Sequence, residues 1–189
     1  MDIFEYIAVL TSIVIGLGIT SLLRGVTRVI QHPEDAAVYW VHLLWVASMF
    51  FTMIFWWWWE FRLGDIAEWT FQLYAFVVLY ALVFYLACAI LFPERMHGYE
   101  GYRDFFYSRR KWFFGLLAFS LLIDVGDSWF KGSEHFASLG PEYTIATGIK
   151  FVLFITAALT RNAVFHGVFA VTFLGYQVYW ALRMFETVA

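Results

Sequence analysis

The chain has 189 residues, of which 62% are hydrophobic and 14% charged, and its formal net charge is −3. Soluble domains have roughly 45–50% apolar and about 25% charged residues, and the excess here comes in long blocks, which indicates lipid as the solvent. The low charge, with no basic run that resembles a nucleic-acid patch, argues against a nucleic-acid partner, and the single Cys88 excludes a disulfide within the chain.

Six segments are long and apolar enough to cross a bilayer, since a spanning helix needs about 20 mostly apolar residues. In chain order they cover residues 6–30, 38–59, 69–92, 112–130, 143–160 and 162–182. The connections between them are short, apart from the charged stretch 93–111. We therefore expect an all-α, polytopic membrane protein, folded as a single domain: a bundle of six transmembrane helices.

Positively charged residues decide the expected orientation, because Lys and Arg gather in cytoplasmic loops. On one side, the second and fourth connections and the two ends of the chain hold only Arg62, Lys131 and Arg183. The other side holds eight such residues: Arg24, Arg28, Arg95, Arg103, Arg109, Arg110, Lys111 and Arg161. This pattern predicts a multi-pass protein of the cell inner membrane, with both termini outside and the loop 93–111 in the cytoplasm.

Three charged residues interrupt the later segments: Asp124 and Asp127 in the fourth and Lys150 in the fifth. Asp124 lies about 18 Å from the start of its segment and Lys150 about 15 Å from the end of the next, at 1.5 Å per residue. Because consecutive helices run antiparallel, the two depths match and predict a direct pair. Ser120 extends the face of Asp124, and Thr144 and Thr147 extend that of Lys150.

This polar seam allows two interpretations. A charge in the bilayer centre costs at least ~2.5–3.5 kcal/mol and often marks an ion or proton pathway, with Asp124, Asp127, Lys150, Ser120 and Thr147 as its residues. Alternatively, the pair is structural and holds two helices in register, with Asp127 hydrated at the outer interface.

His42 and His166 lie at equal depth, each four residues into its segment. Two histidines at one depth on different helices could ligate a b-type haem or a metal, with Trp40, Trp45 and Phe165 beside the macrocycle. The alternative, which we favour, is a pair of interfacial histidines bonded to backbone or headgroups. No cofactor is therefore expected, and a b-type haem is the alternative to test.

Small residues recur at a spacing of four in the first segment, at Ser12, Gly16 and Thr20. Such a stripe lets helix backbones approach closely, so it predicts a packing face and makes a homo-oligomer plausible. No hydrolase or nucleotide-binding motif is present in the sequence, so we expect no enzyme.

Three functions remain open from the sequence. The first, which we favour, is a small channel or transporter for a proton or small ion that uses the Asp124–Lys150 seam. The second is a non-catalytic membrane sensor or assembly subunit with a structural ion pair. The third is a redox or chromophore protein that uses His42 and His166, or Lys150 as a Schiff base.

Overall fold

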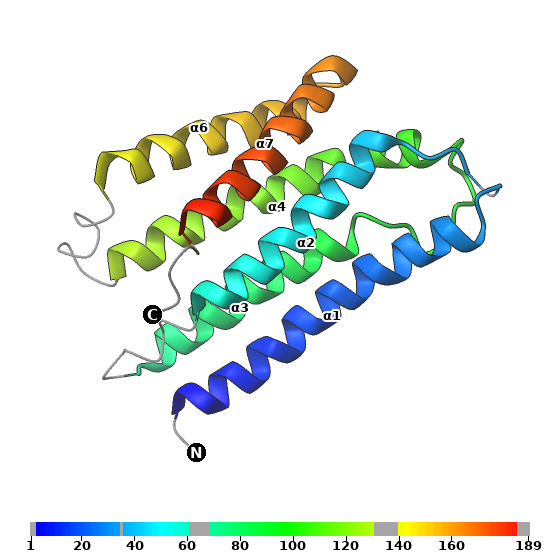
Figure 1. Cartoon of the computed structure of the whole chain (residues 1–189). Helices are drawn as coiled ribbons and strands as arrows, with labels where there is room; N and C mark the ends of the chain where they lie inside the picture. Colours follow the sequence, from blue (N-terminus) through cyan, green and yellow to red (C-terminus); the bar gives the residue numbers. More distant parts are fainter. Residues whose placement is uncertain (1–2, 35, 61–68, 131–139, 185–189) are drawn as a thin grey trace.

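The computed structural model describes residues 3–34, 36–60, 69–130 and 140–184. Over these residues the protein is all-α, with six helices (Figure 1). In chain order they are α1 (Ile3–Gln31), α2 (Trp40–Glu60), α3 (Phe71–Ala89), α4 (Tyr102–Phe130), α6 (Gly140–Leu159) and α7 (Ala163–Met184). The predicted all-α class and the six helices are thus confirmed.

The helices form two layers, and neighbours in space are not always neighbours in sequence. In one layer α1 packs on α3, α3 on α4, and α4 on α6. Across this layer lie α2 and α7, which pack on each other. Each helix runs opposite to the one before it, so the start of α1 and the end of α7 lie at the same end of the bundle (Figure 1).

Three of the helices are long and apolar enough to cross a membrane: Glu5–Gln31 within α1, Trp40–Trp58 within α2, and Phe71–Ala89 as α3. A helix of 19 residues is about 28 Å long at 1.5 Å per residue, close to the ~30 Å of a bilayer's hydrocarbon core. In α6, Tyr143–Leu159 is a shorter apolar helix. Several apolar helices of this kind indicate association with a membrane.

One helix boundary differs clearly from the expectation. The stretch 93–111 was expected to be a loop, but α4 begins at Tyr102, ten residues before Trp112. Phe105 and Phe106 are buried on its first turns, whereas Arg103 and Asp104 point outward. An amphipathic helix of this kind is stabilised by burial of its apolar face, in spite of its charges.

The connections at one end of the bundle are fixed by side chains that bind backbone carbonyls. Arg28 Nη1 donates to the carbonyl oxygens of Pro93 (2.7 Å) and Glu94 (3.0 Å). Arg110 Nε donates to the carbonyl of Thr160, just after α6, at 3.1 Å. Burial, with the nearby positive charge of Arg161, lowers the pKa of Arg110. The carbonyl of Thr160 lies at the end of α6, where backbone carbonyls lack intrahelical partners, so the bond from Arg110 stabilises this end of the bundle.

Candidate functional site

The site is built around Asp124, whose side chain meets α6. Tyr143 Oη donates a hydrogen bond of 2.7 Å to Asp124 Oδ2. The same hydroxyl lies 3.3 Å from Ser128 Oγ, one turn further along α4. A hydrogen bond to a carboxylate is roughly twice as strong as one between neutral groups and favours the charged form. The two helices therefore share a polar network on otherwise apolar surfaces.

Lys150 places a positive charge beside this network. Its ammonium interacts electrostatically with Asp124. Lys150 Nζ also lies 5.7 Å from the centroid of the Tyr176 ring, which belongs to α7. A cation is attracted both by an opposite charge and by the face of an aromatic ring. The structure thus brings Asp124 and Lys150 within electrostatic range, and Lys150 joins α6 to α4 and α7.

The other residues expected in the seam have different environments. Ser120 is buried, and its hydroxyl donates to the carbonyl of Leu117 at 2.8 Å, within α4. Thr147 is also buried, and its Oγ1 has no hydrogen-bond partner among the described residues. Asp127 lies on α4, but its side chain is outside the described part of the structure. Thr144 is exposed on α6.

The role of Tyr143 was not foreseen from the sequence. Tyr143, Thr147 and Lys150 are separated by four and three residues, so all three lie on one face of α6. A hydroxyl on the same helix face as a charged residue can be predicted from the sequence to bond within the polar network, since a charge in apolar surroundings needs partners. Ser128, four residues after Asp124 on α4, follows the same rule.

Gln177 on α7 bonds to α2. Its Nε2 donates to Thr52 Oγ1 at 2.7 Å and to the carbonyl of Ser48 at 3.3 Å. Neither Gln177 Oε1 nor Ser48 Oγ has a partner among the described residues. The interior of the bundle therefore contains a second polar patch, held between α2 and α7.

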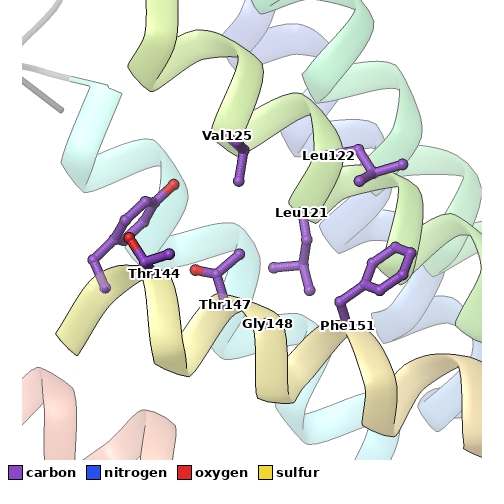
Figure 2. Close-up of a pocket in the computed structure, with 8 residues that line it drawn as sticks. Leu121, Leu122, Val125, Thr144, Thr147, Gly148 and Phe151 are labelled. Carbon is purple, nitrogen blue, oxygen red and sulfur yellow. The ribbon is translucent and has the colours of Figure 1, made fainter. Parts of the chain in front are cut away.

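A groove of about 220 Å³ lies between α4 and α6, next to the Asp124 network (Figure 2). Its walls are mostly apolar, and Tyr143 belongs to its lining. The lining residues on α4 are Leu121, Leu122 and Val125, and those on α6 are Tyr143, Thr144, Thr147, Gly148 and Phe151.

The two candidate haem ligands are both held by backbone carbonyls. His42 Nε2 lies 2.6 Å from the carbonyl of Leu91, and His166 Nε2 lies 3.1 Å from that of Thr160. Both rings contact Phe106, with centroid distances of 6.4 Å and 5.4 Å. The Nδ1 atom of each has no partner among the described residues. These contacts favour a structural role for both histidines.

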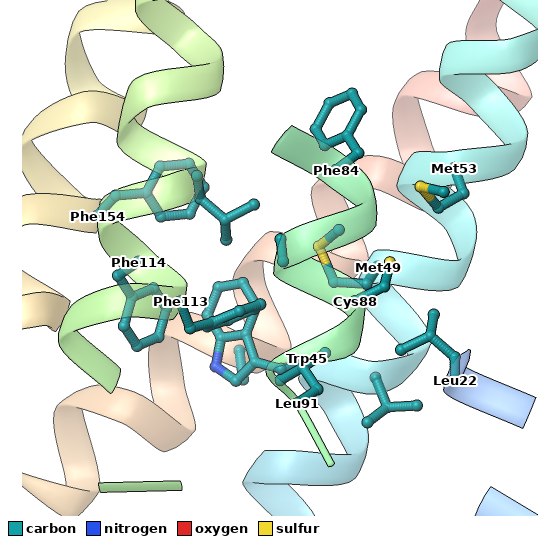
Figure 3. Packing of buried hydrophobic residues seen from close by; sticks show 14 of the residues in the cluster. Leu22, Trp45, Met49, Met53, Phe84, Cys88, Leu91, Phe113, Phe114 and Phe154 are labelled. Carbon is teal, nitrogen blue, oxygen red and sulfur yellow. The ribbon is translucent and has the colours of Figure 1, made fainter. Parts of the chain in front are cut away.

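The space between α2, α4, α6 and α7 is filled by an aromatic cluster around Trp45, which is 0% exposed (Figure 3). Its ring contacts those of five phenylalanines at centroid distances of 5.0–6.4 Å: Phe113, Phe114, Phe154, Phe169 and Phe173. Trp45, considered above as a wall for a macrocycle, is thus packed against side chains of the protein itself.

The stripe of small residues on α1 faces outward. Ser12, Gly16 and Thr20 are exposed, and nothing lies within 4 Å of a Cβ built on Gly16. Gly18, on the other side of the helix, faces Met53 and the backbone of Tyr85. Within one chain, α1 therefore packs through the side that carries Gly18.

Comparison of the chain with protein-family models, with curated proteins and with solved structures gave no match.

Proposed function

We propose that the protein crosses the membrane six times and transports a proton or a small cation through a site formed by Asp124 and Lys150. The observation that carries this proposal is the network in which Asp124 accepts a hydrogen bond from Tyr143 and interacts with Lys150. Ionisable groups within membrane segments are costly and commonly mark ion or proton pathways. A carboxylate with a hydroxyl donor and a nearby ammonium has the parts needed to exchange a proton.

Each residue has a distinct role in this proposal. Asp124 takes up and releases the proton or cation. Lys150 holds Asp124 ionised and competes with the passing ion, while Tyr143 donates to the carboxylate and so stabilises its charged form. Asp127 serves the outer mouth, and the hydroxyls of Ser120 and Thr147 extend the polar face.

The proposal requires α4, α6 and α7 to lie in the bilayer with the three more apolar helices. Their outward faces support this. Large apolar side chains are exposed along all three: Phe119 and Leu122 on α4, Ile145, Ile149, Val152 and Leu159 on α6, and Val164, Val168, Val171 and Leu182 on α7. Soluble monomers rarely expose apolar surface on this scale, whereas lipid covers it without cost.

The orientation follows from the basic residues. Arg28, Arg110 and Arg161 belong to the end of the bundle where α1 and α6 finish and α4 begins. We propose that the protein lies in the cell inner membrane. By the positive-inside rule, this end of the bundle then faces the cytoplasm and both termini lie outside. The exposed stripe of Ser12, Gly16 and Thr20 is the face through which we propose that a homo-oligomer forms.

Ion flux into proteoliposomes tests the function. With a pH-sensitive dye or a cation indicator inside the vesicles, we expect wild-type protein to give flux and Asp124→Asn to abolish it. Asp104→Asn is the matched control, because Asp104 is an exposed carboxylate on the same helix outside the expected span.

The proposal fails if Asp124→Asn and Lys150→Met both transport as well as wild type. No flux from the wild-type protein, together with loss of folded protein in either variant, would favour the second candidate, an assembly or sensor subunit whose charges are structural.

A further inference from the structure

Two arginines meet where α6 ends and α7 begins. Arg110, on α4, is 8% exposed, and its Nε donates to the carbonyl of Thr160 at 3.1 Å. Its Nη1 donates to the carbonyl of Tyr107 at 2.6 Å, so two backbone carbonyls hold the guanidinium in place. Arg161 directly follows Thr160 in the chain, and its side chain is exposed. The bond to Thr160 therefore brings a buried guanidinium beside the residue that carries a second one.

These two positive charges lack a negative partner in the described part of the chain. Neither Arg110 nor Arg161 forms an ion pair with a described residue. Burial and the positive charge of Arg161 lower the pKa of Arg110. Like charges that lie close together repel, and a charge that has lost its water is stabilised by an opposite one. An anion bound between the two guanidinium groups would thus remove an unfavourable interaction.

The position of the two arginines along the bundle identifies the source of this anion. Trp112, two residues after Arg110, is 67% exposed, and Leu159 and Val164, on either side of Arg161, are 70% and 74% exposed. The exposed surface therefore changes from charged to apolar within about one helical turn. Tryptophan is enriched at the boundary between bilayer and water, where the phosphate groups of lipids also lie.

Arginine suits this ligand, because its planar guanidinium binds phosphate oxygens through two parallel hydrogen bonds. A headgroup with choline or ethanolamine would bring a further positive charge to the two arginines, so a lipid without an ammonium group fits better.

We infer that Arg110 and Arg161 bind the phosphate of an anionic phospholipid whose headgroup has no ammonium group. The inference rests on the proposal that α4, α6 and α7 cross the membrane, but it does not require transport.

Native mass spectrometry of the full-length protein in a neutral detergent tests the site. Phosphatidylglycerol and phosphatidylcholine with the same acyl chains are titrated separately, and the fraction of protein that retains lipid is measured. We expect wild-type protein to retain phosphatidylglycerol at lower concentrations than phosphatidylcholine.

One variant and a matched control make the test specific. Arg161→Gln should weaken retention of phosphatidylglycerol about tenfold, the effect of losing a hydrogen bond to a charged group at ~1.5 kcal/mol. Arg161 is exposed, so the variant should fold as wild type does. Arg95→Gln removes the same charge from an exposed arginine in the connection between α3 and α4, and it should retain the lipid as wild type does.

Three outcomes overturn the inference. Equal retention of the two lipids would remove the preference for an anionic headgroup. Equal weakening by Arg161→Gln and Arg95→Gln would show a general attraction to basic residues rather than a site. Displacement of phosphatidylglycerol by inorganic phosphate at the same concentration would show that the arginines bind free phosphate instead. Lipid retention is measured without flux, so failure of the transport proposal and failure of this site are distinguishable.

Discussion

Tyr143 donates a 2.7 Å hydrogen bond to Asp124 and so joins α6 to α4 through a charged acceptor. This bond lies on the face of α6 that also carries Lys150, three helical positions beyond Thr147. A carboxylate in apolar surroundings needs donors or opposite charges to remain ionised, and Asp124 has both a donor in Tyr143 and a nearby charge in Lys150.

Removing this hydrogen bond should destabilise the protein. Tyr143→Phe keeps the ring and deletes the donor, and hydrogen bonds to charged groups contribute about 1.5–3 kcal/mol. We expect the free energy of unfolding, measured by SDS titration in mixed micelles, to fall by about that amount. Tyr179→Phe is the control, since Tyr179 is 57% exposed and should lose its hydroxyl without effect. Equal stability of the two variants would contradict the bond.

The interaction of Asp124 with Lys150 can be measured with a double-mutant cycle. Lys150→Met and Asp124→Asn each remove one charge from a half-buried side chain, and groups that interact directly show coupling energies of about 0.5–3 kcal/mol. We expect the double variant to lose clearly less stability than the sum of the single losses. Additive losses in the same SDS titration would mean that the two charges do not stabilise each other.

The aromatic cluster makes Trp45 the most sensitive tryptophan that we can identify. Trp45→Ala leaves a cavity among five phenylalanines, and truncation of a buried aromatic side chain costs about 3–5 kcal/mol. Trp112→Ala is the control, because Trp112 is 67% exposed. Thermal unfolding in detergent should show a large decrease in midpoint for the first variant and little change for the second. A mild effect of Trp45→Ala would show that the cluster is loosely packed.

Two glycines on α1 test which side of the helix packs inside the chain. Gly18→Leu must displace Met53 and approach the backbone of Tyr85, and overpacking typically costs about 1–3 kcal/mol. Gly16→Leu meets open space and should leave the monomer stable. If the small-residue stripe joins two copies, Gly16→Leu should instead reduce the dimer fraction in size-exclusion chromatography with light scattering. If Gly16→Leu destabilised the monomer and Gly18→Leu did not, the side of α1 that carries Gly18 would not be its packing face.

The haem alternative predicts a visible spectrum that we do not expect to see. With His42 and His166 bonded through Nε2 to backbone carbonyls, reduced-minus-oxidised spectra of the purified protein should lack a Soret band. A Soret band lost in His42→Ala would contradict the structural role given to these histidines.

Much of the fold was predictable from the length and spacing of the apolar runs in the sequence. Long apolar runs must become helices, so all six elements were found, and α1 indeed continues past Arg24 and Arg28. The start of α4 was missed because Arg103, Asp104 and Arg109 made the stretch resemble a polar loop. The buried Phe105 and Phe106 are the helical signal, and they only acquire meaning once a partner surface covers them.

The site was less predictable. The depth of a residue along its helix can be counted from the sequence, but the rotation of the helix about its axis and the helices it packs against cannot be read from it. Matching depths placed Asp124 near Lys150. The contact of Gln177 with Thr52 could not be foreseen, since it depends on α7 packing against α2, four described helices earlier in the chain. The hydroxyl of Tyr143 was within reach of Asp124 only because of the rotation of α6.

The pairing of α2 with α7 has a consequence for biogenesis. Helices emerge from the ribosome in order, and α2 is made more than a hundred residues before its principal partner begins at Ala163. Until α7 has been made, the face of α2 that bears Trp45 and Thr52 lacks its partner within the chain. The interior around Trp45 is therefore complete only once α7 has been made and has packed against α2.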